Sequence, residues 1–167
     1  MVPDRLRPVL IETAELTERF RAAGHRLYLV GGVVRDLILN RLSDLDDLDF
    51  ASDARPDDIE ALVTGWADAV WTQGKRFGTI GCKRGERIFE ITTFRAEAYR
   101  PESRKPDIKF ASEIEADLSR RDFTVNAMAL SLPDLDARAT SQQLCLGQDS
   151  SPQWVEDRQS LVVLSDD

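Results

Sequence analysis

The sequence predicts an α/β fold (α+β in some classifications), because short strand-like segments alternate with helical ones over most of the chain. An apolar segment over 26–30 is a buried strand that runs into a double glycine and then a helix over about 33–39. A second strand over 47–51 carries its aspartates and its large apolar residues on opposite faces. With 167 residues and 42% hydrophobic content, the chain fits one domain with a core of its own.

The remaining elements of the first half follow from periodicity and turn residues. Apolar residues recur among charges over 8–22, which predicts an amphipathic helix that Gly24 ends. Pro56, followed by Asp57 and Asp58, predicts the start of another helix, because proline and acids suit a first helical turn. Further strand-like segments are found at 70–73, 79–82 and 87–93, the last two joined by a turn.

The second half has weaker patterns. Residues 95–109 contain two prolines and many charges without periodicity, and we interpret them as a mobile loop. Residues 113–130 are predicted to be helical, with a break near Asp122. From Pro133 onward the pattern dissolves, and 161–164 is a lone apolar run.

Composition excludes several classes of protein. No segment approaches the roughly 18 apolar residues of a membrane span, and the N-terminus lacks a signal-peptide pattern, so we expect a cytoplasmic protein without membrane contact. Cys82 and Cys145 form neither a zinc set nor a disulfide framework. His25, the single histidine, has no Ser or Cys motif to serve, which argues against triad chemistry and His-based metal sites.

The charge is unevenly distributed. A net charge of −8 is unfavourable for a nucleic-acid-binding protein, because neutralising phosphates needs a basic surface. Residues 75–121, however, hold twelve Lys and Arg against eight Asp and Glu. This basic middle is either a binding surface for nucleic acid or scattered solvated charge, and the sequence leaves both open.

Asp47 and Asp49 are the candidate metal ligands. Acids at positions i and i+2 of a strand point the same way, so both carboxylates can hold one or two divalent cations. Such cations can activate an attacking hydroxyl and stabilise a leaving phosphate. An acidic loop is the alternative, and Asp44 with Asp46 offers a rival pair.

A phosphate site is predicted where the first strand meets its helix. The bare backbone of Gly31 and Gly32 lets N–H groups approach a phosphate, and Arg35 adds a positive fork one helical turn on. The pattern is neither a dinucleotide fingerprint nor a P-loop. A tight turn at the glycines, and an ion pair between Arg35 and Asp36, are the alternatives.

Glu90 is a third candidate acid. It lies on a predicted strand between apolar neighbours, where a carboxylate is costly unless it is paired or binds a metal. Pairing with Arg87 or Arg95 is the alternative.

The stretch 120–129 forms a second motif, Arg-Arg-Asp-Phe-Thr-Val-Asn-Ala-Met-Ala. Helical spacing places Asp122 and Asn126 on one face. A helix-capping role is the alternative for Asp122, and Arg120 is interpreted as solvated.

These motifs, in this order, resemble the N-terminal head domain of the class II CCA-adding enzyme and bacterial poly(A) polymerase family over about residues 26–132. The resemblance implies a polymerase β-like nucleotidyltransferase head, with a small mixed sheet flanked by helices. The stretches that carry it are 29–36, 47–50, 77–80, 91–95 and 120–129.

The resemblance also implies a reaction. A tRNA nucleotidyltransferase adds CCA when the 3′ hydroxyl of tRNA attacks the α-phosphate of CTP or ATP and pyrophosphate leaves. Asp47 and Asp49 are then the ligands of Mg²⁺, and Glu90 is the third catalytic acid. The implied nucleotide-binding residues are Gly31, Gly32, Arg35, Arg121, Asp122 and Asn126.

The resemblance ends after about residue 132. The family continues with an Asp-Pro-aromatic-Gly-Gly turn and a neck helix carrying Glu-Asp-x-x-Arg, whereas here Ser160 stands where that arginine would follow Glu156 and Asp157. We therefore expect a head domain over 1–134 and an atypical, disordered tail over 135–167, without the family's neck, body and tail domains. A poly(A) polymerase, or a truncated head that only binds nucleotide, are alternative functions, and the oligomeric state is open.

Overall fold

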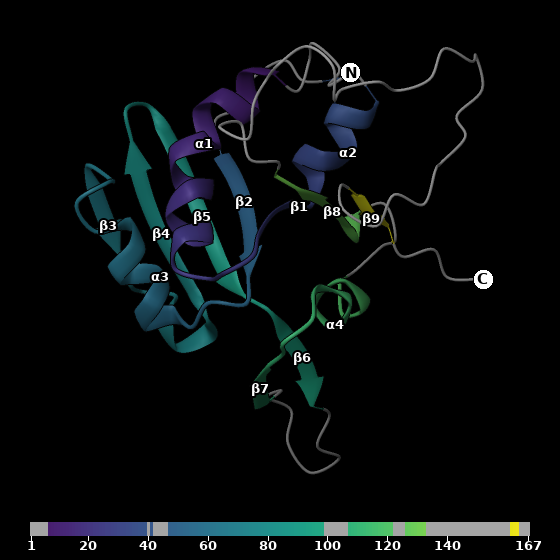
Figure 1. The fold of residues 1–167 in the computed structure, drawn as a ribbon. Coiled ribbons are helices and arrows are strands. Elements are labelled where there is room, and N and C mark those ends of the chain that lie inside the picture. The colour runs from purple at the N-terminus through teal and green to yellow at the C-terminus, as the bar shows by residue number, and fades with distance from the viewer. Residues whose placement is uncertain are drawn as a thin grey trace.

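The computed structural model describes residues 7–39, 41, 47–98, 107–121, 126–132 and 161–163 (Figure 1). Its main feature is a seven-stranded sheet in the order β3-β4-β5-β2-β1-β8-β9. The strands of this sheet are β1 (Leu27–Val30), β2 (Asp47–Ser52), β3 (Ala69–Trp71), β4 (Thr79–Arg84), β5 (Arg87–Thr93), β8 (Met128–Ser131) and β9 (Leu161–Val163). Neighbours pair antiparallel except β2 and β5, which are parallel, so the predicted mixed sheet flanked by helices is confirmed.

Helices pack on both faces of this sheet, and the larger ones cover one face. The helical elements are α1 (Arg7–Ala22), α2 (Gly32–Ile38), α3 (Pro56–Val63), the short 3₁₀ turn η2 (Lys75–Phe77) and α4 (Ile114–Ser119). In Figure 1, α1 and α3 lie in front of the sheet, and a large apolar cluster fills the space between them and the strands. Leu16 and Phe20 of α1 meet Leu48 and Phe50 of β2 in this cluster, all fully buried.

A smaller apolar cluster lies on the opposite face, under α4. Ile114 and Leu118 of α4 pack there with Phe94 and with alanines of the strands, Ala51 and Ala129. The two faces therefore differ in kind, because one is sealed by bulky apolar residues and the other is only partly covered.

The first half of the chain folds as its sequence predicts. The amphipathic helix is α1, and the strand–glycine–helix unit is β1 followed by α2. The helix predicted at Pro56 begins at that residue, with Asp57 and Asp58 in its first turn. The three strands predicted between 70 and 93 are β3, β4 and β5, each shifted at its ends by at most two residues.

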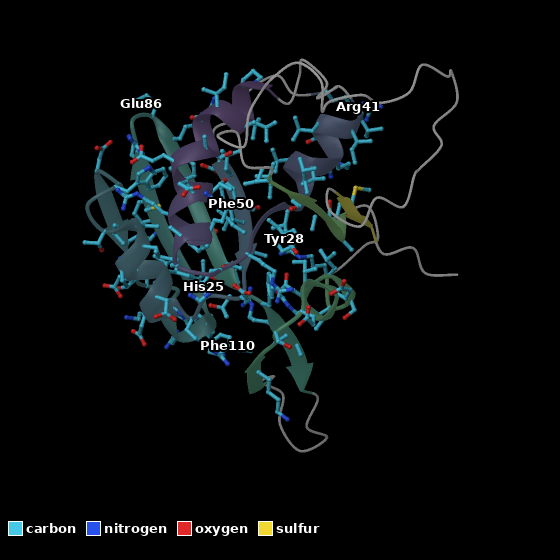
Figure 2. All side chains as sticks on the ribbon, viewed as in Figure 1. His25, Tyr28, Arg41, Phe50, Glu86 and Phe110 are labelled. Carbon is cyan, nitrogen blue, oxygen red and sulfur yellow. The ribbon has the colours of Figure 1, made fainter. Side chains whose placement is uncertain are left out.

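The loop prediction for 95–109 is wrong at both ends of the segment. β6 (Arg95–Ala98) and β7 (Asp107–Phe110) pair antiparallel as a separate two-stranded sheet. This hairpin is held by contacts distant in sequence rather than by apolar alternation: the Phe110 ring packs over Gly78, and the Arg55 guanidinium lies 4.8 Å from its centroid. Figure 2 shows Phe110 where the hairpin meets the body of the molecule.

The helix prediction for 113–130 is also wrong beyond α4. Residues 128–131 form β8, although Met, Ala and Leu favour helices, because pairing with β1 outweighs this weak local preference. Leu29 lies opposite Leu130 in that pairing. Residues 122–125, with the predicted break at Asp122, lie outside the described residues.

The structure describes only one short segment of the predicted C-terminal tail. Residues 161–163 pair with β8 as β9, whereas the rest of 135–167 lies outside the described residues. The division into 1–134 and 135–167 therefore stays a prediction. None of the helices in the described ranges has the length and apolar character needed to cross a membrane.

Candidate active site

The acidic residues lie on the sheet face opposite α1 and α3. Along β2, Leu48 and Phe50 are buried, whereas Asp47 and Asp49 are exposed on the other side of the strand. The parallel pairing of β2 with β5 places Asp49 directly beside Glu90. Since side chains alternate along strands, the register brings all three predicted acids to one face.

A cleft of about 470 Å³ opens on this face. It joins the acidic residues of β2 and β5 to basic residues that follow β5 and α4. Its lining residues are Val30, Asp49, Phe50, Glu90, Thr92, Arg95, Arg120, Arg121 and Asn126. Four of the predicted site residues, far apart in sequence, therefore share one hollow.

Asp49 sits in a mixed electrostatic environment. Burial raises the pKa of its carboxyl group, and the neighbouring Asp47 carboxylate raises it further. The positive charge of Arg121 acts in the opposite direction. A cation bound between the Asp47 and Asp49 carboxylates would offset both the desolvation of Asp49 and the repulsion between the two charges.

Glu90 carries no compensating partner in the part of the chain that the structure describes. Arg87 instead pairs with Glu12 at 2.6 Å, and the Nη1 group of Arg95 donates to the Phe77 carbonyl oxygen at 3.0 Å. Both alternative partners of Glu90 are thus engaged elsewhere. Its carboxylate faces the cleft beside Asp49.

Gly31 occupies the junction between the acids and Arg121. Its φ of 78° lies in the left-handed region that favours glycine. A side chain would begin 3.6 Å from Arg121 Nη1 and 3.9 Å from Asp49 Oδ2. Its own N–H donates to the Met128 carbonyl oxygen at 3.1 Å, so this amide is not available to a phosphate.

Arg35 reaches the cleft only through another residue. Its Nε and Nη2 groups bind both carboxylate oxygens of Asp36, at 2.8 and 2.9 Å, which is the ion pair that the sequence left open. This hydrogen bonding lowers the pKa of Asp36. The Nη1 group of Arg35 donates to Asn126 Oδ1 at 3.0 Å, and Asn126 lines the cleft. Next to it, a Cβ at Gly32 would lie in ordinary van der Waals contact with the Arg35 guanidinium, 3.5 Å from Nη2.

Arg120 differs from its interpretation as a solvated residue. Its side chain is only 19% exposed, lines the cleft and binds Asp117, as does Arg121. Arg95 lines the same wall. Sequence reasoning missed Arg95 and Asp117, although the spacing of Asp117 to the two arginines, three and four residues on, was a visible signal for ion pairs within a helical turn.

The donor set on the acidic side suits a hard divalent cation. Asp47 and Asp49 offer carboxylate oxygens only, and Mg²⁺ is commonly held by one or two carboxylates together with substrate phosphates and water. In the described ranges, no three His, Cys, Asp or Glu side chains group closely enough to form a complete metal site. Asp47 and Asp49 therefore fit a cation that is shared with a phosphate ligand. Asp122, another predicted site residue, lies outside the described residues.

Comparison with known proteins agrees with this architecture. Residues 27–140 match the family model of the poly A polymerase head domain. The chain is 43% identical over 109 residues to the CCA-adding enzyme of Bacillus subtilis (strain 168), covering 65% of this chain and 26% of that protein. It is 38% identical over 130 residues to the CCA-adding enzyme of Lactobacillus helveticus, covering 77% and 31%.

Solved structures give the same result. The Bacillus stearothermophilus CCA-adding enzyme in complex with CTP superposes with a TM-score of 0.58 at 30% identity, over 78% of this chain and 28% of that one. A tRNA nucleotidyltransferase complexed with a primer tRNA and an incoming ATP analog gives 0.52 at 32% identity, over 77% and 33%. The chain thus spans about a third or less of the proteins it matches.

Proposed function

The chain belongs to the family of poly A polymerase head domains, and on that premise we propose that it is a tRNA nucleotidyltransferase that adds CCA to tRNA 3′ ends. The substrates are CTP, ATP and the 3′ end of tRNA, and each transfer releases pyrophosphate. Relatives named as CCA-adding enzymes, one solved with CTP and another family structure with primer tRNA and an ATP analog, support this choice of substrates. We infer that the protein acts in the cytoplasm, where it would meet its tRNA substrate.

The observation that carries the proposal is the two-sided cleft. Asp49 and Glu90 form one wall, Arg120 and Arg121 form another, and Asn126 lines the same hollow. A nucleoside triphosphate needs this division, because its phosphates require positive donors while its reacting phosphorus requires metal-binding carboxylates nearby.

We assign the acidic wall to catalysis. Asp47 and Asp49 hold Mg²⁺, and Glu90, beside Asp49 in the register, is the third acid. When bound, Mg²⁺ supplies an activated 3′ hydroxyl and charge stabilisation on the leaving pyrophosphate. The remaining contribution of the protein is to hold the two reactants close together and in line.

We assign the basic and glycine-rich side to the nucleotide. The Arg121 guanidinium, beside Gly31 and Asp49, binds the triphosphate, and the absence of a side chain at Gly31 keeps that approach open. Gly32, Arg35 and Asn126 complete the binding surface, Arg35 acting through its hydrogen bond to Asn126. Asp122 keeps its predicted role toward the sugar or the neighbouring side chains.

The test is incorporation of labelled CTP and ATP, separately and together, into a tRNA that lacks its 3′ CCA, using the full 167-residue chain and Mg²⁺. We expect addition by the wild-type chain and none by Asp47→Ala/Asp49→Ala. A matched control is Asp57→Ala/Asp58→Ala, which removes an acidic pair in the first turn of α3, outside the cleft, and should retain addition.

The nucleotide used separates the related activities. Addition of CMP supports CCA addition, whereas addition of AMP alone, repeatedly, would assign poly(A) polymerase activity. A folded wild-type chain that binds CTP but transfers nothing would leave nucleotide binding as its function.

A further inference from the structure

Asp117 is the most deeply buried carboxylate around the cleft. Its side chain has no exposed surface, yet it lies on α4 within the wall that carries three arginines. A buried charge is tolerated only when other groups satisfy it. The groups that bind Asp117 therefore explain why a buried carboxylate is tolerated there.

Those partners are all basic residues of the cleft. Oδ1 accepts from Nε and Nη2 of Arg120 at 3.0 and 2.7 Å and from the backbone N–H of Arg95 at 3.1 Å. Oδ2 accepts from Nε and Nη2 of Arg121 at 3.1 and 2.9 Å. The Asp117 carboxylate thus binds Nε and Nη2 of both guanidinium groups. It also anchors the backbone of Arg95, the first residue of β6.

This pairing uses only the Nε and Nη2 edge of each guanidinium group. Among the described residues, the Nη1 groups of Arg120 and Arg121 make no hydrogen bond, and that of Arg121 lies beside Gly31 and close to Asp49. The Nε group of Arg95 is buried without a hydrogen-bond partner in the same part of the chain. Of these groups, the Arg95 Nε is the buried one, and a buried N–H group is normally paired, so an anion in the cleft would supply the partner it lacks.

The charge balance also favours an anionic ligand. Two guanidinium groups bind the Asp117 carboxylate, and that of Arg95 lines the same cleft, so three positive charges face one negative charge on this wall. Burial and the nearby charges of Arg120 and Arg121 lower the pKa of Arg95, which reflects how crowded the positive charges are. A polyphosphate would relieve that crowding.

We propose that Asp117 is a positioning residue, which holds the guanidinium groups of Arg120 and Arg121 in the orientation that binds the triphosphate, with Arg95 as a further donor. The inference rests on the proposed function, because it assumes a nucleoside triphosphate in the cleft. It adds Arg95 and Arg120 to the phosphate-binding side of the site and gives Asp117 an indirect role.

The test is binding of CTP and of inorganic tripolyphosphate to wild type and Asp117→Asn, by isothermal titration calorimetry. Three possible roles of Asp117 predict different results. If it positions the arginines, the substitution weakens both ligands about tenfold or more, because the two guanidinium groups lose the charge-assisted hydrogen bonds that orient them. If it acted only as a nearby negative charge, its neutralisation would tighten anion binding. If it were only structural, the melting temperature would fall without a change in affinity.

The matched control is Asp53→Asn. Asp53 also binds an arginine, accepting from the Nε and backbone N–H of Arg26 at 2.9 and 3.0 Å, but it does not line the cleft. We expect this variant to keep both affinities. In transfer assays, Asp117→Asn should raise KM for CTP more than it lowers kcat, because it disturbs binding rather than the acidic pair.

A second variant, Arg120→Gln, tests the proposal if Asp117→Asn does not fold. Arg120→Gln changes a residue at the cleft rim and leaves Asp117 paired with Arg121. We expect severalfold weaker tripolyphosphate binding, and no change in Arg55→Gln, whose guanidinium stacks on Phe110 outside the cleft.

Unchanged or tighter binding by Asp117→Asn, or unchanged binding by Arg120→Gln, would overturn the positioning role while leaving the proposed function intact. A wild-type chain that binds neither CTP nor tripolyphosphate would overturn the proposed function and this inference together.

Discussion

Strand β2 has two faces, and their contrast shows how one short segment serves both stability and chemistry. Leu48 and Phe50 point toward α1 and α3 and are fully buried, whereas Asp47 and Asp49 lie on the face that these helices leave open. Alternation along a strand makes this division possible within four residues. The position of the helices, rather than the strand itself, decides which face becomes the site.

The two faces are also held together by different forces. On the covered face, large rings pack directly, as with Phe50 and Phe89, whose centroids are 6.0 Å apart. On the open face the apolar cluster is smaller, with Phe94, Ile114 and Leu118 packed on small strand residues, and ion pairs around Asp117 fix the wall of the cleft. Substitutions should therefore affect folding on one face and ligand binding on the other.

The largest expected effect on stability comes from Phe50→Ala. Truncating a fully buried phenylalanine should lower the free energy of unfolding by about 3–5 kcal/mol, through lost burial and the cavity left behind. Chemical denaturation followed by circular dichroism would measure it. Asp49→Ala, one residue away on the other face, should leave this free energy nearly unchanged or higher while removing transfer activity. A similar loss of stability in both variants would contradict the division of faces.

An intermediate effect is expected from Gly31→Ala. At φ 78° and ψ −146°, a region that almost only glycine adopts, a non-glycine residue is strained by about 1–3 kcal/mol, and its methyl group would enter the approach between Arg121 and Asp49. Gly65→Ala is the matched control, because Gly65 has the same φ of 78° and nothing within 4 Å of the place that a Cβ would take. We expect similar losses of melting temperature, but weaker CTP binding only in Gly31→Ala. Equal CTP affinity in both would show that Gly31 serves the turn alone.

The same contrast explains what the sequence could predict. Period-two alternation at 47–51 and the helix start at Pro56 are local signals, and both were correct. The strands β6, β7 and β8 were missed, because they depend on contacts distant in sequence, such as Phe110 over Gly78 and Leu130 opposite Leu29. Propensity and periodicity carry no information about such pairings.

The site was predictable to the same extent. Motifs pointed to Asp49, Glu90 and Arg121, which the fold brings into one cleft and whose roles stay predictions. The engagement of Arg35 by Asp36 and Asn126 could be seen only in the fold. Asp117 was overlooked because a helical acid three and four residues before two arginines usually makes an ordinary surface ion pair. Only its complete burial, and its bond to the distant backbone of Arg95, distinguish it.

The smallest and most specific effect should come from Asp49→Asn, measured without metal. Because the folded protein raises the pKa of this carboxyl group, it binds the proton more tightly than the unfolded chain, whose value is near 3.8. Stability then falls as pH rises through the window from that value to the folded pKa, and stays lower above it. Asparagine cannot ionise and escapes this loss.

The Asn variant should therefore melt higher than wild type at neutral pH in EDTA, and the difference should vanish as pH falls below about 3.8. Leu48 and Phe50 have no titratable group, so this pH dependence of the melting temperature reports on the open face alone. Addition of Mg²⁺ should reverse the order by stabilising only the wild-type chain, since a ligand that binds the folded state raises its melting temperature. A lower melting temperature for Asp49→Asn in EDTA would mean that attraction to Arg121 outweighs burial, and that the open face is stabilised by its charges even without a cation.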